Sequence, residues 1–411
     1  MILGALIAVA VLSGPPRQLV AGPGTAYPTL ASALAAADSG DSIRLGRGEY
    51  REGPLTIRVP LTLTGERGAV LYGGPFTLLT VTADSVTIRG LEFRDIPPSA
   101  SEDRAALKVA GARGCRLEDL RFTNTFFGLY LSKVTGCVVR RNVARGTGRL
   151  ESLSGNAIHS WSSSQLVIEG NDLSGHRDGI YFEFTTDSRV AGNLSAGNHR
   201  YGIHFMFSDG NTYEGNRFLH NGAGVAVMYS KRVRMTRNRF EDSWGSATYG
   251  LLLKDISDSE LDHNRFRANS VGLYAEGTTR VTLTANEFLG NGWGAQVMAN
   301  AVDTRFLRNR FEGNSFDVAT NSVNASSEFR GNFWDRYTGY DLDRDGTGDV
   351  PFAPVRLFAL VVQQNPPALI LLRSFFISLL DAAERVAPAL TPQTMVDQSP
   401  LLRWNGEEAV P

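Results

Sequence analysis

The sequence contains few cysteines and almost no excess charge, and each deficit excludes a class of protein. Two cysteines in 411 residues cannot form the disulfide framework of a small secreted domain. The 41 basic and 42 acidic side chains leave a net charge of −1, which gives no long-range attraction to nucleic acid or anionic lipid. The apolar run at residues 1–12 is too short to cross a bilayer. We therefore expect no nucleic-acid partner, and membrane contact only through partner proteins.

The chain instead contains a repeat of about 22 residues, and a repeat of this length indicates a solenoid or a related repeat architecture. Its clearest landmarks are glycines followed by alternating apolar residues, at Gly179, Gly202, Gly224, Gly250, Gly272 and Gly294. A series of asparagines keeps the same spacing, at Asn171, Asn193, Asn216, Asn238, Asn264, Asn286, Asn309 and Asn332. A further series follows most of these at a constant distance, at His176, Asn198, Asn221, Asn269, Asn291 and Asn314.

The pattern inside each repeat indicates which solenoid it forms. Alternation after each glycine is typical of a strand with one buried face. Three such short strands per repeat, with no helical segment and no leucine-rich frame, predict an all-β, right-handed parallel β-helix. Asparagine suits a repeated turn, because it tolerates left-handed backbone angles and its amide can bond to the next coil.

Both ends of the chain differ from the repeat. Residues 1–14 resemble a signal peptide, which predicts export. We expect the β-helix to occupy residues 22–335, with a helix at residues 28–38 covering its first coil. An Asp-rich closing segment is expected at residues 336–365, followed by a helix and tail at residues 366–411.

The predicted C-terminal helix, residues 366–385, is amphipathic, and Arg373 interrupts its apolar run, which argues against a membrane span. Its apolar residues at helical spacing are Leu369, Leu372, Phe376, Leu380 and Ala383. The helix either closes the last coil or docks onto a partner, since Ile370, Phe375 and Ile377 add apolar surface on the opposite side.

Cys115 and Cys137 lie one repeat apart, so adjacent coils should place them in one column about 4.8 Å apart. A buried pair of thiols that fills the core is the favoured interpretation. A disulfide or a soft-metal pair is the alternative.

Residues 341–349 resemble a calcium-binding loop. Asp341, Asp343, Asp345 and Asp349 stand at the spacing that wraps oxygen ligands around one cation. Phe352 occupies the position where such loops carry a bidentate glutamate. The segment is therefore either a calcium site or a simple Asp/Gly turn.

Candidate metal ligands lie on the strands that follow the glycines. The second and fourth residues after each glycine should point away from the core. By this sorting His204, Met206 and Met228 share one outer face, with the two methionines about 4.8 Å apart and His204 about 6.6 Å from Met206. Thioether and imidazole ligands together select copper, chiefly Cu(I). Glu183, one coil earlier, could be a further ligand or support one.

Two neighbouring side chains fit this metal site less well, and a simpler interpretation remains open. Met298 is also sorted outward, but it lies about 14 Å from Met228, and His159 is two coils from His204. The alternative is an apolar outer strip that packs under a loop or a partner.

A carbohydrate-acting β-helix, either a lyase, a hydrolase or a binding module, is the alternative function. A hydrolytic site needs two carboxylates close together. The outward Glu183 and Glu276 lie four coils apart, about 19 Å, which is too far for such a pair. The pattern thus disfavours an enzyme.

Several blocks resemble the NosD family of periplasmic accessory proteins for nitrous oxide reductase. They are residues 155–159, 177–184, 200–209, 224–230, 249–255 and 339–343 and the tail around Leu380. The resemblance implies a non-enzymatic β-helix that acts in maturation of the reductase. It implies copper, taken from a chaperone, for the reductase's copper–sulfide centre. It also implies association with an ABC transporter, permease and ATPase, through the C-terminal end.

Overall fold

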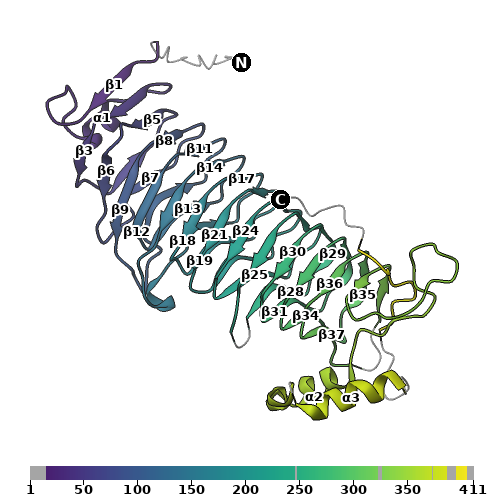
Figure 1. Ribbon diagram of the computed structural model, residues 1–411. Coiled ribbons are helices and arrows are strands. Elements are labelled where there is room, and N and C mark those ends of the chain that lie inside the picture. The colour runs from purple at the N-terminus through teal and green to yellow at the C-terminus, as the bar shows by residue number, and fades with distance from the viewer. Residues whose placement is uncertain (1–14, 246–247, 323–325, 373, 387–394, 405–411) are drawn as a thin grey trace, which may run out of the picture.

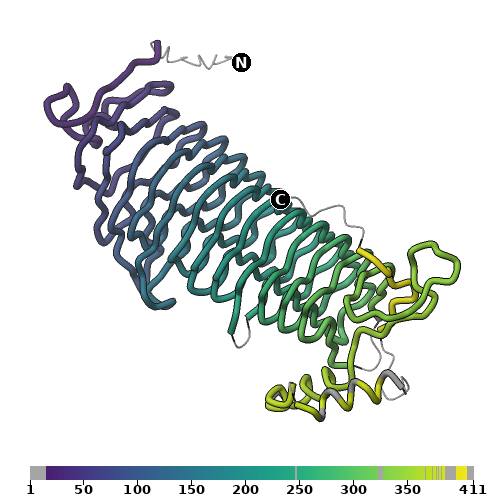
Figure 2. Tube along the Cα trace, in the orientation of Figure 1, coloured from purple at the N-terminus to yellow at the C-terminus, as the bar shows by residue number. Residues whose placement is uncertain are grey.

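The computed structural model describes residues 15–245, 248–322, 326–372, 374–386 and 395–404. It shows a long cylinder of stacked coils with two helices beside its C-terminal end (Figures 1 and 2). Strands pair in parallel with the corresponding strand one coil away, and three sheets form the walls. The predicted right-handed parallel β-helix is confirmed. The predicted signal peptide, residues 1–14, lies outside the described residues.

Sheet A forms one wall and, in the described part of the chain, has 14 strands. Its strands are β1 (Gln18–Ala21), β2 (Ser42–Leu45), β5 (Thr62–Gly65), β8 (Thr87–Arg89), β11 (Arg116–Glu118), β14 (Val138–Arg140), β17 (Val167–Glu169), β20 (Arg189–Ala191), β23 (Thr212–Glu214), β26 (Arg234–Thr236), β29 (Ser257–Asp262), β32 (Thr279–Thr284), β35 (Val302–Leu307) and β38 (Ser326–Arg330). Aliphatic side chains such as Leu117 and Val139 occupy register-matched inner positions and are fully buried.

Sheet B forms the second wall, with 13 strands among the described residues. They are β3 (Gly48–Tyr50), β6 (Ala69–Tyr72), β9 (Glu92–Ile96), β12 (Arg121–Thr125), β15 (Val143–Arg145), β18 (Asp172–Ser174), β21 (Leu194–Ala196), β24 (Arg217–Leu219), β27 (Arg239–Glu241), β30 (Arg265–Arg267), β33 (Glu287–Leu289), β36 (Arg310–Glu312) and β39 (Phe333–Trp334). Its inner face carries a stack of rings, in which Phe266 and Phe288 lie 4.8 Å apart. This stack fills the core with one side chain per coil.

Sheet C forms the third wall and, where the chain is described, has 12 strands. They are β4 (Leu55–Ile57), β7 (Leu79–Val81), β10 (Ala105–Ala110), β13 (Phe127–Ser132), β16 (Ile158–Trp161), β19 (Asp178–Glu183), β22 (Tyr201–Met206), β25 (Ala223–Met228), β28 (Tyr249–Lys254), β31 (Val271–Glu276), β34 (Trp293–Val297) and β37 (Phe316–Ala319). In β19, β22, β25, β28, β31 and β34 the repeated glycine is the second residue, and the outer face of these strands carries the candidate metal ligands.

A continuous asparagine ladder joins sheets A and B inside the turns. Each side-chain oxygen accepts two hydrogen bonds from the preceding coil: Asn238 Oδ1 accepts from the backbone nitrogen of Asn216 at 3.0 Å and from its Nδ2 at 2.9 Å. The same Nδ2 donates to the Val190 carbonyl at 2.9 Å. The predicted ladder is confirmed, and it starts earlier, at Asn142. Since these amides are buried, each missing partner would leave a polar group unsatisfied.

The ladder ends on a carboxylate instead of another asparagine. Asp397, fully buried, accepts from the backbone nitrogens of Gly331 at 3.0 Å and Asn332 at 2.8 Å, and from Trp334 Nε1 at 3.1 Å. Asp397 also forms a β-bridge with Phe329 of β38, the last strand of sheet A. Leu401 forms one with Phe333 of β39, the last strand of sheet B. The C-terminal tail therefore supplies the partners that a further coil would have supplied.

A strand and a helix close the N-terminal end. The predicted helix is confirmed as α1 (Leu30–Ala36), with Thr29 accepting from Ser32 as its N-cap. The Glu52 carboxylate accepts from the backbone nitrogens of Leu30 and Ala31 at 2.9 and 2.8 Å. Strand β1 precedes the helix and pairs with β2, so the β-helix begins earlier than the predicted residue 22.

Cys115 and Cys137, which directly precede β11 and β14, form a disulfide, and both are fully buried. The favoured interpretation of two free thiols is wrong. Adjacent coils bring the two Cα atoms to 4.5 Å, which is within the range that a disulfide spans.

The C-terminal region differs from the single predicted helix at residues 366–385. It contains α2 (Leu357–Gln364), the 3₁₀ helix η2 (Pro366–Leu371) and α3 (Phe375–Val386). Bonds from Leu372 to Leu369 and from Ser374 to Leu371 tighten the backbone into 3₁₀ turns, which end the run before α3 starts. Helix α2 lies inside the segment predicted to be a closing loop. Its apolar side packs on β37, the last strand of sheet C.

Burial in this region also differs from the prediction. Ile377, expected on the outer side, is buried against Phe358, whereas Leu369, expected on the packed side, is exposed. Leu372 and Leu380 do pack against the same cluster; the side chain of Phe376 lies outside the described residues. Among the described residues, no helix combines the length and apolar character needed to span a membrane.

We expect Asp397→Ala to lower the free energy of unfolding by about 2–4 kcal/mol, because several buried donors lose their acceptor together. Asp397→Asn keeps one acceptor oxygen and should lose less. Urea unfolding followed by circular dichroism measures both. An alanine variant that unfolds at the wild-type midpoint would contradict the role given to this carboxylate.

Candidate functional site

The register of sheet C brings the predicted ligands onto adjacent coils. Met206 pairs with Met228 on β25, and Glu183 on β19 pairs with Met206. Within β22, Ile203 and Phe205 belong to the core, so the alternating His204 and Met206 face away from it. We call His204, Met206 and Met228 the thioether–imidazole cluster. The structure also keeps Glu183 beside it, one coil away.

The three members of the cluster differ in accessibility. Met206 and Met228 are half-buried, whereas the His204 side chain is almost fully covered. Burial lowers the pKa of His204 from 6.5 to about 4. The imidazole is therefore neutral at physiological pH, which is the form that can bind a metal ion.

An ion pair that the sequence pattern did not identify holds the His204 ring. The Arg200 guanidinium donates to the buried Asp178 carboxylate at 2.9 and 2.5 Å, and also to His204 Nδ1 at 3.2 Å. His204 Nε2 is buried and has no hydrogen-bond partner among the described residues. Asp178 and Arg200 lie one repeat apart, and that spacing is the signal that could have identified the pair.

The ring of His204 ends a column of stacked aromatic side chains along sheet C. Tyr130 stacks on His159 at 4.4 Å, His159 stacks on Tyr181 at 4.8 Å, and Tyr181 meets His204 edge-on at 5.1 Å. Burial lowers the pKa of His159 to about 3, and Asn156 Nδ2 bonds to its Nδ1 at 3.0 Å. His159 is thus a buried member of this ring column, two coils from His204.

Beside the methionines, three further rings form an exposed stack. Phe184, Phe207 and Tyr229 follow Glu183, Met206 and Met228 directly in the chain, and their rings stack at 5.2 and 5.0 Å. Each is at least 41% exposed. An apolar surface of aligned rings therefore borders the methionine pair.

The outer face of sheet C does not bring its glutamates together. Register runs from Glu183 through Met206, Met228 and Lys254 to Glu276, which places the two carboxylates four coils apart. Lys254 lies 3.9 Å from Glu276. At about 19 Å the two glutamates are too far apart to act as a hydrolytic pair.

One prediction for this face is wrong, and one for the turn that precedes β19 is confirmed. Met298, sorted outward by its position after Gly294, is buried beyond the end of β34 and offers no accessible thioether. His176 belongs to the second asparagine series: its backbone nitrogen donates to Asn198 Oδ1 at 3.2 Å.

In the Asp-rich loop, three of the four predicted calcium ligands come together. Asp341, Asp343 and Asp345 each offer an oxygen within 4.8 Å of the others. Asp349 is outside this group; its carboxylate accepts from the backbone nitrogen of Leu342 at 2.6 Å. Calcium binding by this loop stays a prediction.

The fold and this face together define a class: a parallel β-helix protein whose outer wall carries soft binding side chains. The family model described as "Periplasmic copper-binding protein (NosD)" matches residues 143–339. A probable ABC transporter binding protein NosD from Pseudomonas aeruginosa is 31% identical, over 91% of this chain and 91% of the relative. A protein of the same description from Stutzerimonas stutzeri is 27% identical, over 89% and 87%. The chain belongs to the NosD family, as its sequence blocks indicated.

Solved structures share the fold at low identity. The A-module of the Azotobacter vinelandii mannuronan C-5 epimerase AlgE6 has a TM-score of 0.61 at 16% identity, over 74% of this chain and 92% of that one. The AlgE4 A-module from the same organism has a TM-score of 0.59 at 14% identity, over 73% and 94%. At such identities the likeness describes the fold alone.

The buried histidine of the second asparagine series predicts a pH effect. Burial lowers the pKa of His176 from 6.5 to about 4. Between these values the unfolded chain binds more protons, so stability falls as the pH falls. His176→Asn, which matches the neighbouring coils, should remove this loss. Relative to wild type, the variant should gain about 1–3 kcal/mol in free energy of unfolding between pH 7 and pH 4.

Urea unfolding at pH 7.0, 5.5 and 4.0 measures the effect. His220→Asn, at an exposed histidine two coils further on, is the matched control and should follow the wild-type pH dependence. A difference between His176→Asn and wild type that stays constant over this range would contradict the prediction.

Proposed function

We propose that this protein is a periplasmic, non-enzymatic accessory protein for maturation of nitrous oxide reductase, and that it carries Cu(I) for the copper–sulfide centre. One observation carries the proposal: register pairs Met206 with Met228 on adjacent coils, and His204 lies on the same outer face two residues before Met206. Family membership supports it, since the matching model describes a periplasmic copper-binding protein.

The chemistry of these side chains fits Cu(I) as cargo. Thioethers and neutral imidazole are soft ligands, which favour Cu(I) over hard cations such as calcium. The methionines are half-buried, so an incoming ion meets flexible ligands before it reaches the covered ring. Arg200, held by Asp178, fixes the orientation of that ring. Glu183, one coil away, supplies a carboxylate beside the methionines.

The exposed ring stack supports exchange of copper with protein partners. Phe184, Phe207 and Tyr229 form an apolar strip next to Met206 and Met228. A copper chaperone or the reductase that docks on this strip would place its own ligands beside the methionines and exclude water. Transfer then proceeds by ligand exchange, without release of the ion.

The C-terminal helices support the second part of the proposal, docking to the permease and ATPase subunits of an ABC transporter. The described residues of η2 and α3 carry several large apolar side chains that the β-helix does not cover, and the most exposed are Ile370 (90%), Phe375 (82%) and Leu379 (57%). Relatives are described as ABC transporter binding proteins. An apolar surface of this kind is typical of a docking site.

For copper, we expect the double substitution Met206→Leu, Met228→Leu to weaken Cu(I) binding at least tenfold, since leucine keeps the apolar volume but removes both sulfur ligands. Anaerobic competition with bicinchoninate measures the affinity. Met235→Leu removes a thioether from the core and should leave the affinity unchanged. A double variant with wild-type affinity would exclude this cluster as the copper site.

For docking, Ile370→Ser with Phe375→Ser should abolish capture of the detergent-solubilised transporter by the immobilised protein, while the circular dichroism spectrum stays that of wild type. Leu342→Ser is the matched control, because Leu342 is 78% exposed but lies in the Asp-rich loop. Equal capture by the double variant and the control would place the docking surface elsewhere.

A further inference from the structure

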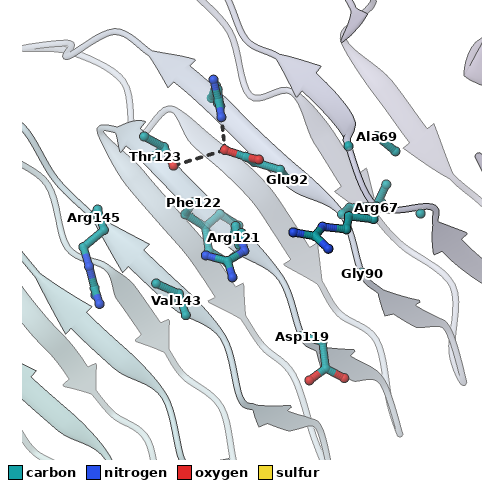
Figure 3. A pocket seen from close by; sticks show the side chains of 14 residues that line it. Arg67, Ala69, Gly90, Glu92, Asp119, Arg121, Phe122, Thr123, Val143 and Arg145 are labelled. Atoms are coloured by element: carbon teal, nitrogen blue, oxygen red, sulfur yellow. Dashed lines mark hydrogen bonds and ion pairs between the residues drawn. The ribbon is translucent and has the colours of Figure 1, made fainter. Parts of the chain in front are cut away.

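A groove with a volume of about 620 Å³ lies on the outer face of sheet B, across β6, β9, β12 and β15 (Figure 3). It is in the N-terminal half of the β-helix and on a different wall from the thioether–imidazole cluster. Its volume is within the range of small-molecule sites. The proposed copper function does not use it.

Four arginines and two acids contribute to the lining, and both acids are already paired. Glu92 accepts from Arg94 Nε at 2.5 Å, and Thr123 Oγ1 lies 3.4 Å from the same oxygen. Asp119 accepts two bonds from Arg141, both at 2.8 Å, which lowers the pKa of its carboxyl group. Neither acid is therefore available to neutralise another cation.

The remaining arginines divide into one paired and two unpaired side chains. Arg145 donates to Asp172 on the next coil. Arg67 and Arg121 have no hydrogen-bond or ion-pair partner for their guanidinium groups among the described residues, although both project into the groove (Figure 3). Two uncompensated positive charges thus face one space.

Register explains why Arg121 stays unpaired. Its neighbour across the sheet on one side is Glu92, which bonds to Arg94 from its own strand instead. On the other side its neighbour is Val143, which offers no charge. The lining therefore keeps a guanidinium free to bind a ligand from solution.

Two glycines in the lining allow adjacent coils to approach closely. Gly90 has φ of +70°, and a Cβ atom added there would lie 2.9 Å from the Gly65 carbonyl oxygen. A Cβ atom at Gly65 would lie 2.7 Å from the Gly90 oxygen. Both positions therefore require glycine, because a side chain at either one would collide with the neighbouring coil.

We propose that this groove binds a small anionic molecule carrying two or more oxyanion groups, with Arg67 and Arg121 as its principal ligands. A guanidinium group binds carboxylate or phosphate oxygens through paired N–H donors, and its positive charge persists at all physiological pH values. Two such groups in one groove select a molecule whose negative charges are spaced along its length. Carboxylate and phosphate compounds share this chemistry.

Titration calorimetry on the full-length, metal-free protein at low salt tests the proposal, with tricarballylate and inorganic pyrophosphate as separate probes. We expect at least one probe to bind, and its affinity to fall as salt increases. Binding of tricarballylate alone would indicate a polycarboxylate ligand, and binding of pyrophosphate alone a phosphorylated one. Absence of binding by both probes at millimolar concentration would overturn the proposal.

Paired variants identify the residues. Arg67→Gln with Arg121→Gln should weaken binding of the active probe at least tenfold. Both side chains are exposed, so the fold should be unaffected. Arg305→Gln, at an exposed arginine of β35 on sheet A, is the matched control and should bind as wild type. A double variant that binds as tightly as this control would exclude the groove as the site.

Discussion

Hydrogen bonding between side-chain amides of successive coils is the constraint on which this structure depends. Asn216, for example, gives its backbone and side-chain N–H groups to Asn238 Oδ1, and the same bonds recur along the cylinder. Because a buried amide without a partner costs free energy, every coil must place its asparagine in register with the next. The insertion after Glu241 falls between β27 of sheet B and β28 of sheet C. It therefore leaves the turn between sheets A and B unchanged, and Asn238 still bonds to Asn264 there.

Fixed register converts a repeated sequence into columns of side chains on the outer walls. On sheet C it aligns Met206 with Met228 and stacks Phe184, Phe207 and Tyr229 beside them. On sheet B it places Arg121 between Glu92 and Val143, so that one arginine stays unpaired. The core face repeats almost unchanged, whereas the outer face varies from coil to coil. Side chains that can bind ligands therefore occupy the outer positions, where the fold does not constrain the residue type.

A stack of coils must also be closed at both ends, and the two closures differ. At the N-terminal end, α1 lies over the first coils and Glu52 satisfies its first backbone donors. At the C-terminal end, Asp397 completes the amide ladder, and α2 packs on β37. Helix α3 adds apolar side chains, such as Phe375, that closure does not require. This surplus is the physical basis of the proposed docking to a transporter.

The sequence by itself determined the coil, the amide ladder and the outward side of His204, Met206 and Met228, because each follows from a period that local residues repeat. The tertiary structure decided which of several neighbouring groups each side chain binds. Cys115 bonds to Cys137, Arg200 turns to Asp178, and Asp397 returns from the tail to Asn332. It also decided which side chains are covered: Met298 and Ile377 are buried and Leu369 is exposed. A repeat fixes which residues are neighbours, but only the folded chain fixes which neighbour each side chain binds, since segments outside the repeat compete for the same donors and surfaces.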